Sequence, residues 1–122
     1  MVLLDTNAII YYLQNERQAV ACIDALHKKN ESFVLSTITE VEVFSHPELQ
    51  AETILNISQW MRDFIVVPVD SIIAREAARF RREFRLKTPD AIIVATAFSF
   101  GIPCVTRDAQ LKKIKAITTI AC

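Results

Sequence analysis

Short apolar segments alternate along this chain with longer segments that have the spacing of helices. The apolar segments, which have strand character, span residues 2–4, 33–35, 64–67, 103–106 and 116–120. The helical segments span residues 6–13, 15–29, 38–44, 47–62, 71–85 and 89–100, and a short one begins at 108. Strands that are apolar throughout are typical of parallel sheets buried on both faces, and their alternation with helices indicates βαβ units. We therefore predict an α/β fold with a mostly parallel sheet covered by helices on both faces.

The predicted helix ends rest on residues with the chemistry of caps. Asn15 is placed as the cap of the second helix, and Pro47 in the first turn of the fourth. Thr88 is placed as a cap, with Pro89 at the first helical position. Gly101, the only glycine in the chain, is placed as the left-handed residue that ends this helix.

Length and composition indicate one globular unit. A chain of 122 residues is long enough for one domain and too short for two, so we expect a single domain over residues 1–122. With 52% hydrophobic and 23% charged residues, the composition is that of a folded protein. Fourteen basic residues balance fourteen acidic ones. This balance argues against a general polyanion binder without excluding one, because charge can be segregated on the surface or offset by bound metal.

Cysteine usage and apolar run lengths bear on the cellular compartment. Cys22, Cys104 and Cys122 are an odd set without tight spacing, which indicates free thiols in a reducing compartment. Strand character from Val2 onward argues against a signal peptide. The longest apolar stretch, Ala91 to Phe98, is far too short to cross a bilayer of roughly 30 Å. We expect a cytoplasmic protein without a membrane segment.

Four acidic residues lie where the predicted fold brings segments together. Asp5 follows the first strand, Glu42 lies in the helix after the second, and Asp108 follows the fourth. The carboxyl ends of parallel strands share one edge of a sheet, and ligands bind there. Asp90 occupies the first turn of a helix that is apolar nearly all round, which we expect to be buried. Its carboxylate then needs a partner, because burying an unpaired charge is costly.

Convergence of these carboxylates predicts a metal site. Four converging carboxylates repel one another and raise one another's pKa values, and a divalent cation resolves that conflict. Oxygen donors suit Mg²⁺ or Mn²⁺ rather than zinc, and His27 and His46 match no zinc spacing. Acidic clusters that hold such ions cleave phosphodiester bonds with a metal-activated water. The predicted catalytic residues and metal ligands are Asp5, Glu42, Asp90 and Asp108.

Four sequence blocks resemble those of the PIN-domain nuclease family in order and spacing. They read LLDTN (residues 3–7), STITEVE (36–42), PDAIIVATA (89–97) and TRD (106–108), and together they span almost the whole chain. The nearest resemblance is to the toxin ribonucleases of VapBC-type toxin–antitoxin pairs. It implies a three-layer α/β/α sandwich, Mg²⁺ or Mn²⁺ dependence, cleavage of RNA to a 5′-phosphate product, homodimers and inhibition by a cognate antitoxin protein. Residues 110–112 read QLK where some members carry a further acidic residue, so the number of metals stays open.

Each candidate residue also has a structural interpretation. Asp5 and Asp108 are suited to capping the helices that follow them, and Asp90 to a first-turn charge against the helix dipole. A capping box from Thr37 to Glu40 gives Glu40 a structural role, so we favour Glu42 as the site residue. Three neighbours are interpreted as supporting residues of the site: Thr6, Asn7 and Thr106. A turn role is the alternative for Thr6 and a capping role for Asn7, and Thr106 would orient the Asp108 carboxylate.

The segment from Arg75 to Lys87 holds six of the fourteen basic residues. Arg75, Arg79 and Arg82 share one face of its helix. That face is either an ordinary solvated surface or a contact for RNA backbone phosphates. Aromatic residues raise a similar choice between base stacking and core or dimer packing: Trp60, Tyr11 and Tyr12.

Two rival functions stay in view. An aspartate after the first strand also begins haloacid-dehalogenase-like phosphatases, but those enzymes need a second aspartate where this chain has Asn7. The rival from another class is a degenerate PIN domain that binds RNA or protein without cleavage. Four intact acidic residues argue against that alternative.

Overall fold

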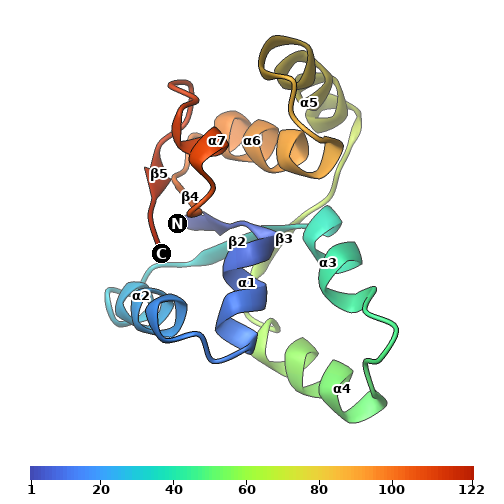
Figure 1. Ribbon diagram of the computed structural model, residues 1–122, viewed down its shortest axis with the longest axis vertical. Coiled ribbons are helices and arrows are strands. Elements are labelled where there is room, and N and C mark those ends of the chain that lie inside the picture. Colours follow the sequence, from blue (N-terminus) through green and yellow to red (C-terminus); the bar gives the residue numbers. More distant parts are fainter.

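Five parallel strands form the centre of the molecule in the computed structural model, which describes residues 1–122 (Figure 1). The strand order is β3-β2-β1-β4-β5, and every neighbouring pair is parallel. The strands are β1 (Val2–Leu4), β2 (Phe33–Ser36), β3 (Ile65–Val67), β4 (Cys104–Val105) and β5 (Thr119–Ile120). The predicted α/β fold with a parallel sheet is therefore confirmed.

Seven helices cover the two faces of this sheet (Figure 1). They are α1 (Thr6–Leu13), α2 (Arg17–Lys28), α3 (Thr37–Phe44), α4 (Ala51–Trp60), α5 (Ser71–Phe84), α6 (Thr88–Phe100) and α7 (Ala109–Lys112). In β1, Leu3 belongs to a core shared with α5 and α6, whereas Val2 and Leu4 belong to a second core shared with α1, α2 and α4. Successive strand residues point to opposite faces, so one three-residue strand contributes to both cores.

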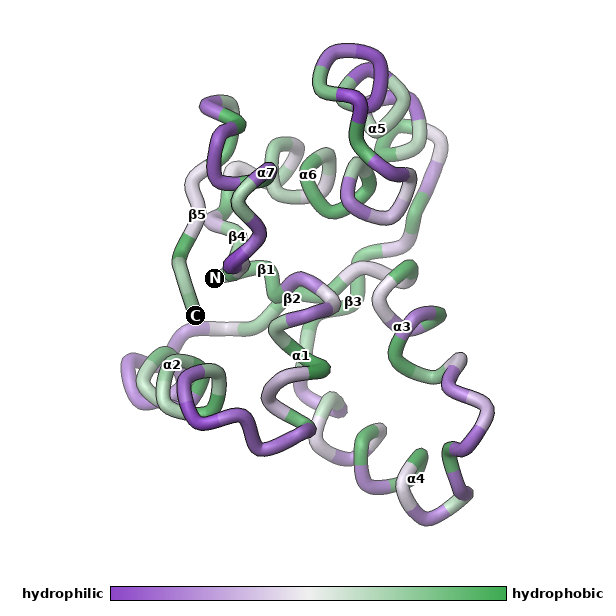
Figure 2. The backbone as a smooth tube through the Cα atoms, viewed as in Figure 1, coloured by the Kyte–Doolittle hydropathy of each residue, from purple (hydrophilic) through white to green (hydrophobic).

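Helix α6 is the most deeply buried helix. Every residue from Ala91 to Ala97 is buried, which agrees with its apolar composition on all sides. Helix α5 packs along it and shields it from solvent, and Figure 2 shows hydrophilic segments in α5 beside the mainly hydrophobic tube of α6. The burial predicted for α6 is thus confirmed. Asp90 lies in its first turn, where the helix is only partly buried.

Three predicted helix starts are wrong in detail. Asn15 lies in the left-handed region (φ 57°) before α2, and Glu16 caps α2 by accepting from the backbone N–H groups of residues 18 and 19. Pro47 lies in a turn ahead of α4, which begins at Ala51. Helix α6 begins at Thr88 itself, and Lys87 is its cap residue. Gly101 ends α6 in the left-handed conformation, as predicted.

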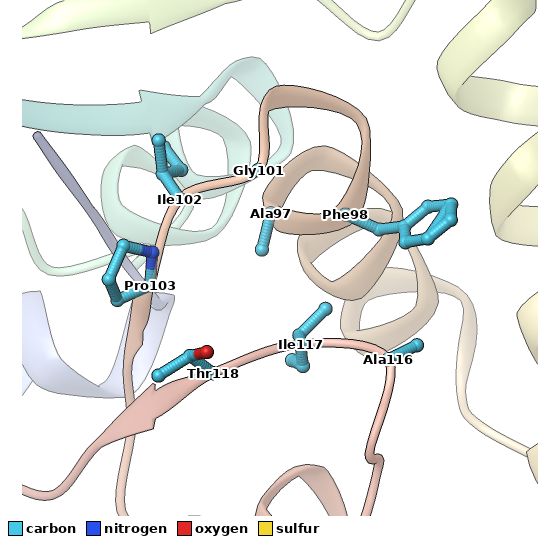
Figure 3. Close-up of a pocket in the computed structure, with 8 residues that line it drawn as sticks. All are labelled: Ala97, Phe98, Gly101, Ile102, Pro103, Ala116, Ile117 and Thr118. Atoms are coloured by element: carbon cyan, nitrogen blue, oxygen red, sulfur yellow. The ribbon is translucent and has the colours of Figure 1, made fainter.

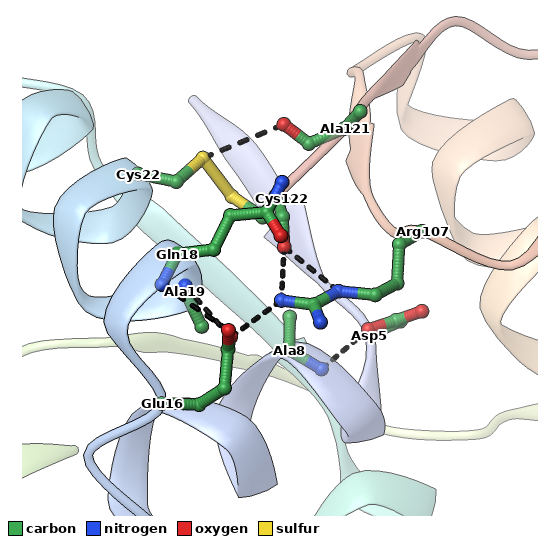
Figure 4. Close-up of a disulfide and its surroundings, with 9 residues drawn as sticks. All are labelled: Asp5, Ala8, Glu16, Gln18, Ala19, Cys22, Arg107, Ala121 and Cys122. Atoms are coloured by element: carbon green, nitrogen blue, oxygen red, sulfur yellow. Dashed lines mark hydrogen bonds and ion pairs between the residues drawn. A yellow bond between two sulfur atoms is a disulfide. The ribbon is translucent and has the colours of Figure 1, made fainter.

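The prediction of three free thiols is wrong for two of the cysteines. Cys22 of α2 and Cys122 after β5 form a disulfide, although 100 positions separate them. A separation of this length gives no spacing signal in the sequence, and the pair meets only because the fold brings the segment after β5 against α2 (Figure 4). Cys104 is free and buried. None of the helices has both the length and the apolar character needed to cross a membrane.

Candidate active site

The four predicted acidic residues come together at the carboxyl edge of the sheet. Strands β2, β1 and β4 are neighbours in the sheet. Asp5 follows β1, Asp108 lies three residues after β4, and α3 after β2 carries Glu42. Asp90 reaches the same edge through α6, which packs against α3, β2 and β4. The neighbourhood predicted from strand order is therefore present, while the roles of these residues stay a prediction.

Asp5 is buried, with 7% of its surface exposed. It caps α1, and its Oδ1 accepts a hydrogen bond of 2.7 Å from the backbone N–H of Ala8. Burial raises the pKa of Asp5 above its ordinary value, and the nearby charge of Asp108 raises it further. The Thr106 hydroxyl and the Ala8 N–H act in the opposite direction on that pKa. Asp5 therefore has the capping role that the sequence left open. Its charge is also repelled by the charge of Asp108.

The Thr6 hydroxyl bonds to Glu42 and is itself paired with the Thr39 hydroxyl. The Thr6 Oγ1 donates to Glu42 Oε1 at 2.8 Å and lies 3.0 Å from the Thr39 Oγ1. Both threonines are buried, and Glu42 is exposed to solvent. Thr6 thus joins the helix after β1 to the helix after β2. It is more than a turn hydroxyl, which was the alternative for this residue.

The capping box predicted for Thr37 and Glu40 is wrong. The cap of α3 is Ser36, whose Oγ accepts from the backbone N–H of Ile38 at 3.1 Å. The Thr37 Oγ1 instead accepts from the backbone N–H of Val69 at 3.2 Å, which ties α3 to the segment after β3. Glu40 takes part in no side-chain hydrogen bond, so its structural role disappears.

Asp90 is half-buried in the first turn of α6. Its pKa is raised, first by burial and then by the charges of the three other acidic residues of the site. Lys87, the residue before α6, lowers this pKa only in part. Since the other three carboxylates all act on Asp90, the four charges lie within electrostatic reach of one another.

Asp108 has a capping role and a role in this charge cluster. Its Oδ1 accepts from the backbone N–H groups of Gln110 (2.7 Å) and Leu111 (3.2 Å), and so begins α7. The backbone N–H of Asp108 donates to the Thr106 Oγ1 at 3.1 Å. Thr106 is fully buried just after β4 and interacts with both Asp108 and Asp5, while its supporting role stays a prediction.

The donor chemistry of the cluster fits a hard divalent cation. All four side chains offer carboxylate oxygens, which Mg²⁺ and Mn²⁺ prefer, and a cation would offset the repulsion that raises the pKa values of Asp5 and Asp90. No three acidic, histidine or cysteine side chains are arranged closely enough in this structure to hold a metal. One oxygen of each of Asp5, Glu42 and Asp108 accepts a hydrogen bond from a protein donor, so the second oxygen of each carboxylate would be available to an ion.

Arg107 is a residue of this edge that the sequence analysis did not single out. Its guanidinium donates to Glu16 at 2.6 Å and to the backbone oxygen of Cys122 (Nε at 2.8 Å) (Figure 4). It also lies over the Tyr11 ring, with 4.4 Å to the centroid. Its charge also lowers the pKa of Asp5. Its position inside the TRD block was the available signal.

The remaining predicted residues lie further from the cluster. Asn7 is exposed on the first turn of α1 and forms no side-chain hydrogen bond. The arginines of α5 border an open surface hollow of about 390 Å³. Arg79 is already paired there with Glu76 (2.9 Å) and Glu83 (3.4 Å), and it lies over the rings of two phenylalanines. Arg75 and Arg82 have no ion pair, so they carry the free positive charge of this face.

Two cavities near the sheet differ in their relation to the acidic edge. One of about 240 Å³ lies between α1, α3 and α4; Glu42 lines it together with apolar residues such as Leu13 and Ile57. The other, of about 200 Å³, lies where α6 ends at Gly101 and the chain approaches β5 (Figure 3). No charged side chain lines the second cavity, and it faces the amino ends of β4 and β5. It is therefore not part of the acidic site.

Comparisons with known proteins agree with this fold. The family model described as PIN domain matches residues 2–117. A structure of a toxin-antitoxin complex from Klebsiella pneumoniae is similar to this chain with a TM-score of 0.84 and 27% identity, over 98% of this chain and 97% of that chain. FitAcB from Neisseria gonorrhoeae is similar with a TM-score of 0.77 and 24% identity, over 98% and 96%. VapBC2 from Rickettsia felis, bound to a DNA fragment from its promoter, is similar with a TM-score of 0.82 and 16% identity, over 99% of this chain and 98% of that chain. The last two support the fold alone, and the comparison with curated proteins finds no match.

Proposed function

Because this chain belongs to the PIN-domain family, we propose that it is a nuclease that hydrolyses phosphodiester bonds in RNA. The observation that carries the proposal is the electrostatic strain at the acidic edge, where Asp5 and Asp90 have raised pKa values and neighbouring acids contribute to both. Such like-charge clusters are unfavourable for the fold and are found where a cation or a reaction uses them. The proposed catalytic residues are Asp5, Glu42, Asp90 and Asp108.

These four carboxylates would hold Mg²⁺ or Mn²⁺. A divalent ion at such a site activates water for attack on phosphorus and offsets the negative charge that develops on the phosphate. The chain's own contribution is positioning. Thr6 orients Glu42 by a hydrogen bond, and Thr106 fixes the backbone of Asp108. Asn7, in the first turn of α1, is the remaining supporting residue of the proposal.

Substrate contacts would come from the basic face of α5. Arg75 and Arg82 are free of ion pairs and exposed, as required for contacts with backbone phosphates. Arg79 contributes less in this proposal, because Glu76 and Glu83 already balance its charge. Helices α5 and α6 are joined by only three residues, so Arg82 near the end of α5 lies closer to the start of α6, and to Asp90, than Arg75 does.

The proposed biological role is that of a cytoplasmic toxin restrained by a cognate antitoxin protein. The relative with 27% identity comes from a toxin–antitoxin complex. The apolar cavity between α1, α3 and α4 offers a place for an antitoxin segment, and Glu42 in its lining would bring that segment to the active site. A homodimer is proposed as well, because large apolar side chains are exposed on β3, α5 and α6: Ile65, Val66, Ile72, Phe98 and Phe100.

The test uses the purified chain with labelled single-stranded RNA. Cleavage is expected with Mn²⁺ and not with EDTA, and Asp90→Asn should abolish it while the exposed control Glu52→Gln leaves it unchanged. Mn²⁺ should also raise the melting temperature of the wild type more than that of Asp90→Asn, because binding to the native state adds stability. Equal cleavage with Mn²⁺ and EDTA would refute the metal mechanism. RNA binding without cleavage or metal stabilisation would support the non-catalytic alternative.

A further inference from the structure

A second concave site lies far from the acidic edge, at the amino ends of β2 and β3. It is a cavity of about 310 Å³ between the end of α1, the middle of α2 and the segment that joins α4 to β3. This volume is at the lower end of the range of about 300–1,000 Å³ that is typical of ligand sites. Phe33, the first residue of β2, lines it, whereas the catalytic candidates follow the opposite ends of the strands.

The wall of this cavity is a continuous series of aromatic rings. Tyr12 and Trp60 are stacked with 4.5 Å between centroids, and Trp60 meets Phe64 edge-on at 5.0 Å. Phe64 meets Phe33 edge-on at 5.3 Å, and His27 follows Phe33 at 6.4 Å. All five rings line the same cavity. Aromatic faces carry negative electrostatic potential and attract cations.

Two carboxylates complete the lining, and no lysine or arginine side chain does. Asp24 extends from α2 beside the Tyr12 hydroxyl, which donates to it at 3.4 Å. Asp63 stands at the rim with 90% of its side chain exposed, and its one ionic contact, to Arg62, is 3.8 Å long. Exposed pairs of this kind contribute little free energy, so both carboxylates are available to a ligand. Burial raises the pKa of Tyr12, and the charge of Asp24 raises it further.

We propose that this aromatic cavity binds a guanidinium cation, namely an arginine side chain of a protein partner, between its rings and the carboxylates of Asp24 and Asp63. A guanidinium is planar and weakly hydrated, so it can stack on aromatic faces and still form paired hydrogen bonds with carboxylates. A lysine ammonium is more strongly hydrated and forms no stack. A nucleotide phosphate is disfavoured, because both charged groups of the lining are acidic. This proposal does not depend on nuclease activity.

The test is a fluorescence titration, because Trp60 is the only tryptophan of the chain and lies in the cavity wall. The full chain is titrated with Nα-acetyl-arginine amide and with its neutral isostere, Nα-acetyl-citrulline amide. A saturable change with a dissociation constant in the millimolar range is expected for the arginine compound alone. The double variant Asp24→Asn/Asp63→Asn should weaken binding about fivefold or more, since two partly exposed charge pairs are lost. Glu52→Gln, an exposed carboxylate on α4 outside the cavity, should leave binding unchanged.

Other outcomes overturn the proposal. Equal responses to the arginine and citrulline compounds would show that charge plays no part, and absence of a saturable response would show that the cavity takes no guanidinium. Unchanged binding in the double variant, with an unchanged melting temperature, would place the interaction elsewhere. A response to guanosine that the double variant abolishes, without one to the arginine compound, would assign the cavity to an RNA base instead.

Discussion

Asp5 combines a favourable hydrogen bond with an unfavourable charge, and two substitutions separate these effects. Its Oδ1 caps α1 by accepting from the Ala8 N–H at 2.7 Å. Its charge is disfavoured by burial and by Asp108, which together raise its pKa. Asp5→Asn keeps an oxygen that can cap the helix and removes the charge. Asp5→Ala removes both.

The magnitude of the capping contribution follows from this geometry. Replacing a bonded cap residue by alanine costs about 0.5–2 kcal/mol, with about 1 kcal/mol typical, whereas asparagine caps as well as aspartate. A difference of about 1 kcal/mol shifts the melting temperature of a chain of this length by roughly 3–5 °C. In the metal-free protein near neutral pH, Asp5→Asn should melt at or above the wild-type temperature. Asp5→Ala should melt below Asp5→Asn by that amount.

The dependence on pH checks the sign of the charge effect. Because the pKa of Asp5 is raised in the folded state, protonation favours the folded protein, and the unfavourable charge is fully present only above the folded pKa. Lowering the pH from above the folded pKa to below the ordinary pKa of an aspartate should therefore progressively remove any advantage of Asp5→Asn over the wild type. Comparing the two proteins at each pH cancels the groups that the Asp5 charge does not influence, such as Glu16, whose pKa is lowered by its hydrogen bond with Arg107. Asp90 does not cancel, because the Asp5 charge helps to raise its pKa, and its contribution acts in the same direction as that of Asp5. Thermal or urea unfolding with EDTA present is the assay. If Asp5→Asn loses as much stability as Asp5→Ala at neutral pH, the charge is stabilising and the reasoning fails.

The other predictions concern the second acid and the disulfide. Glu42→Gln should lower RNA cleavage on the order of a hundredfold, the scale of losing one positioned catalytic group; Glu40→Gln should keep full activity, and the reverse result would show that Glu40 is the site residue. Reducing the Cys22–Cys122 disulfide should lower the melting temperature of the wild type by up to roughly 12–25 °C, since closing a loop of 100 residues contributes up to about 4–5 kcal/mol. The variant Cys22→Ser/Cys122→Ser should melt at the reduced wild-type temperature with or without reductant. A wild-type melting temperature that reductant leaves unchanged would contradict the disulfide's contribution.

The sheet and the acidic edge were predictable because they follow from local patterns and one topological rule. Apolar runs gave the strands, and Asp5, Glu42 and Asp108 follow strands that end at a common edge. Asp90 was predictable for a different reason. An acid at the start of a helix that is apolar on all sides is expected to be at least partly buried, and burying an unpaired carboxylate is unfavourable. Asp90 was therefore expected to lie near a partner.

The features that were not predictable depend on contacts between distant segments. Cys22 and Cys122 are 100 positions apart, and Arg107 contacts Glu16 across 91 positions. The Thr37 capping box failed for the same kind of reason. Its hydroxyl has a partner in the Val69 backbone, 32 positions away, and this tertiary contact displaces the local pattern that the sequence offered.

The electrostatic strain at the acidic edge is informative because it involves several like charges. No buried side-chain nitrogen or oxygen in the chain lacks a hydrogen-bond partner, so the fold satisfies its polar groups everywhere. Burial raises the pKa of Asp5 and of Asp90, and the charge of Asp108 raises both further. Capping alone does not account for this, because a neutral residue would cap α1 as well as Asp5 does. Clusters of like charge that the fold does not need for capping are found at functional sites, and this supports the proposal that a bound cation neutralises the acidic edge.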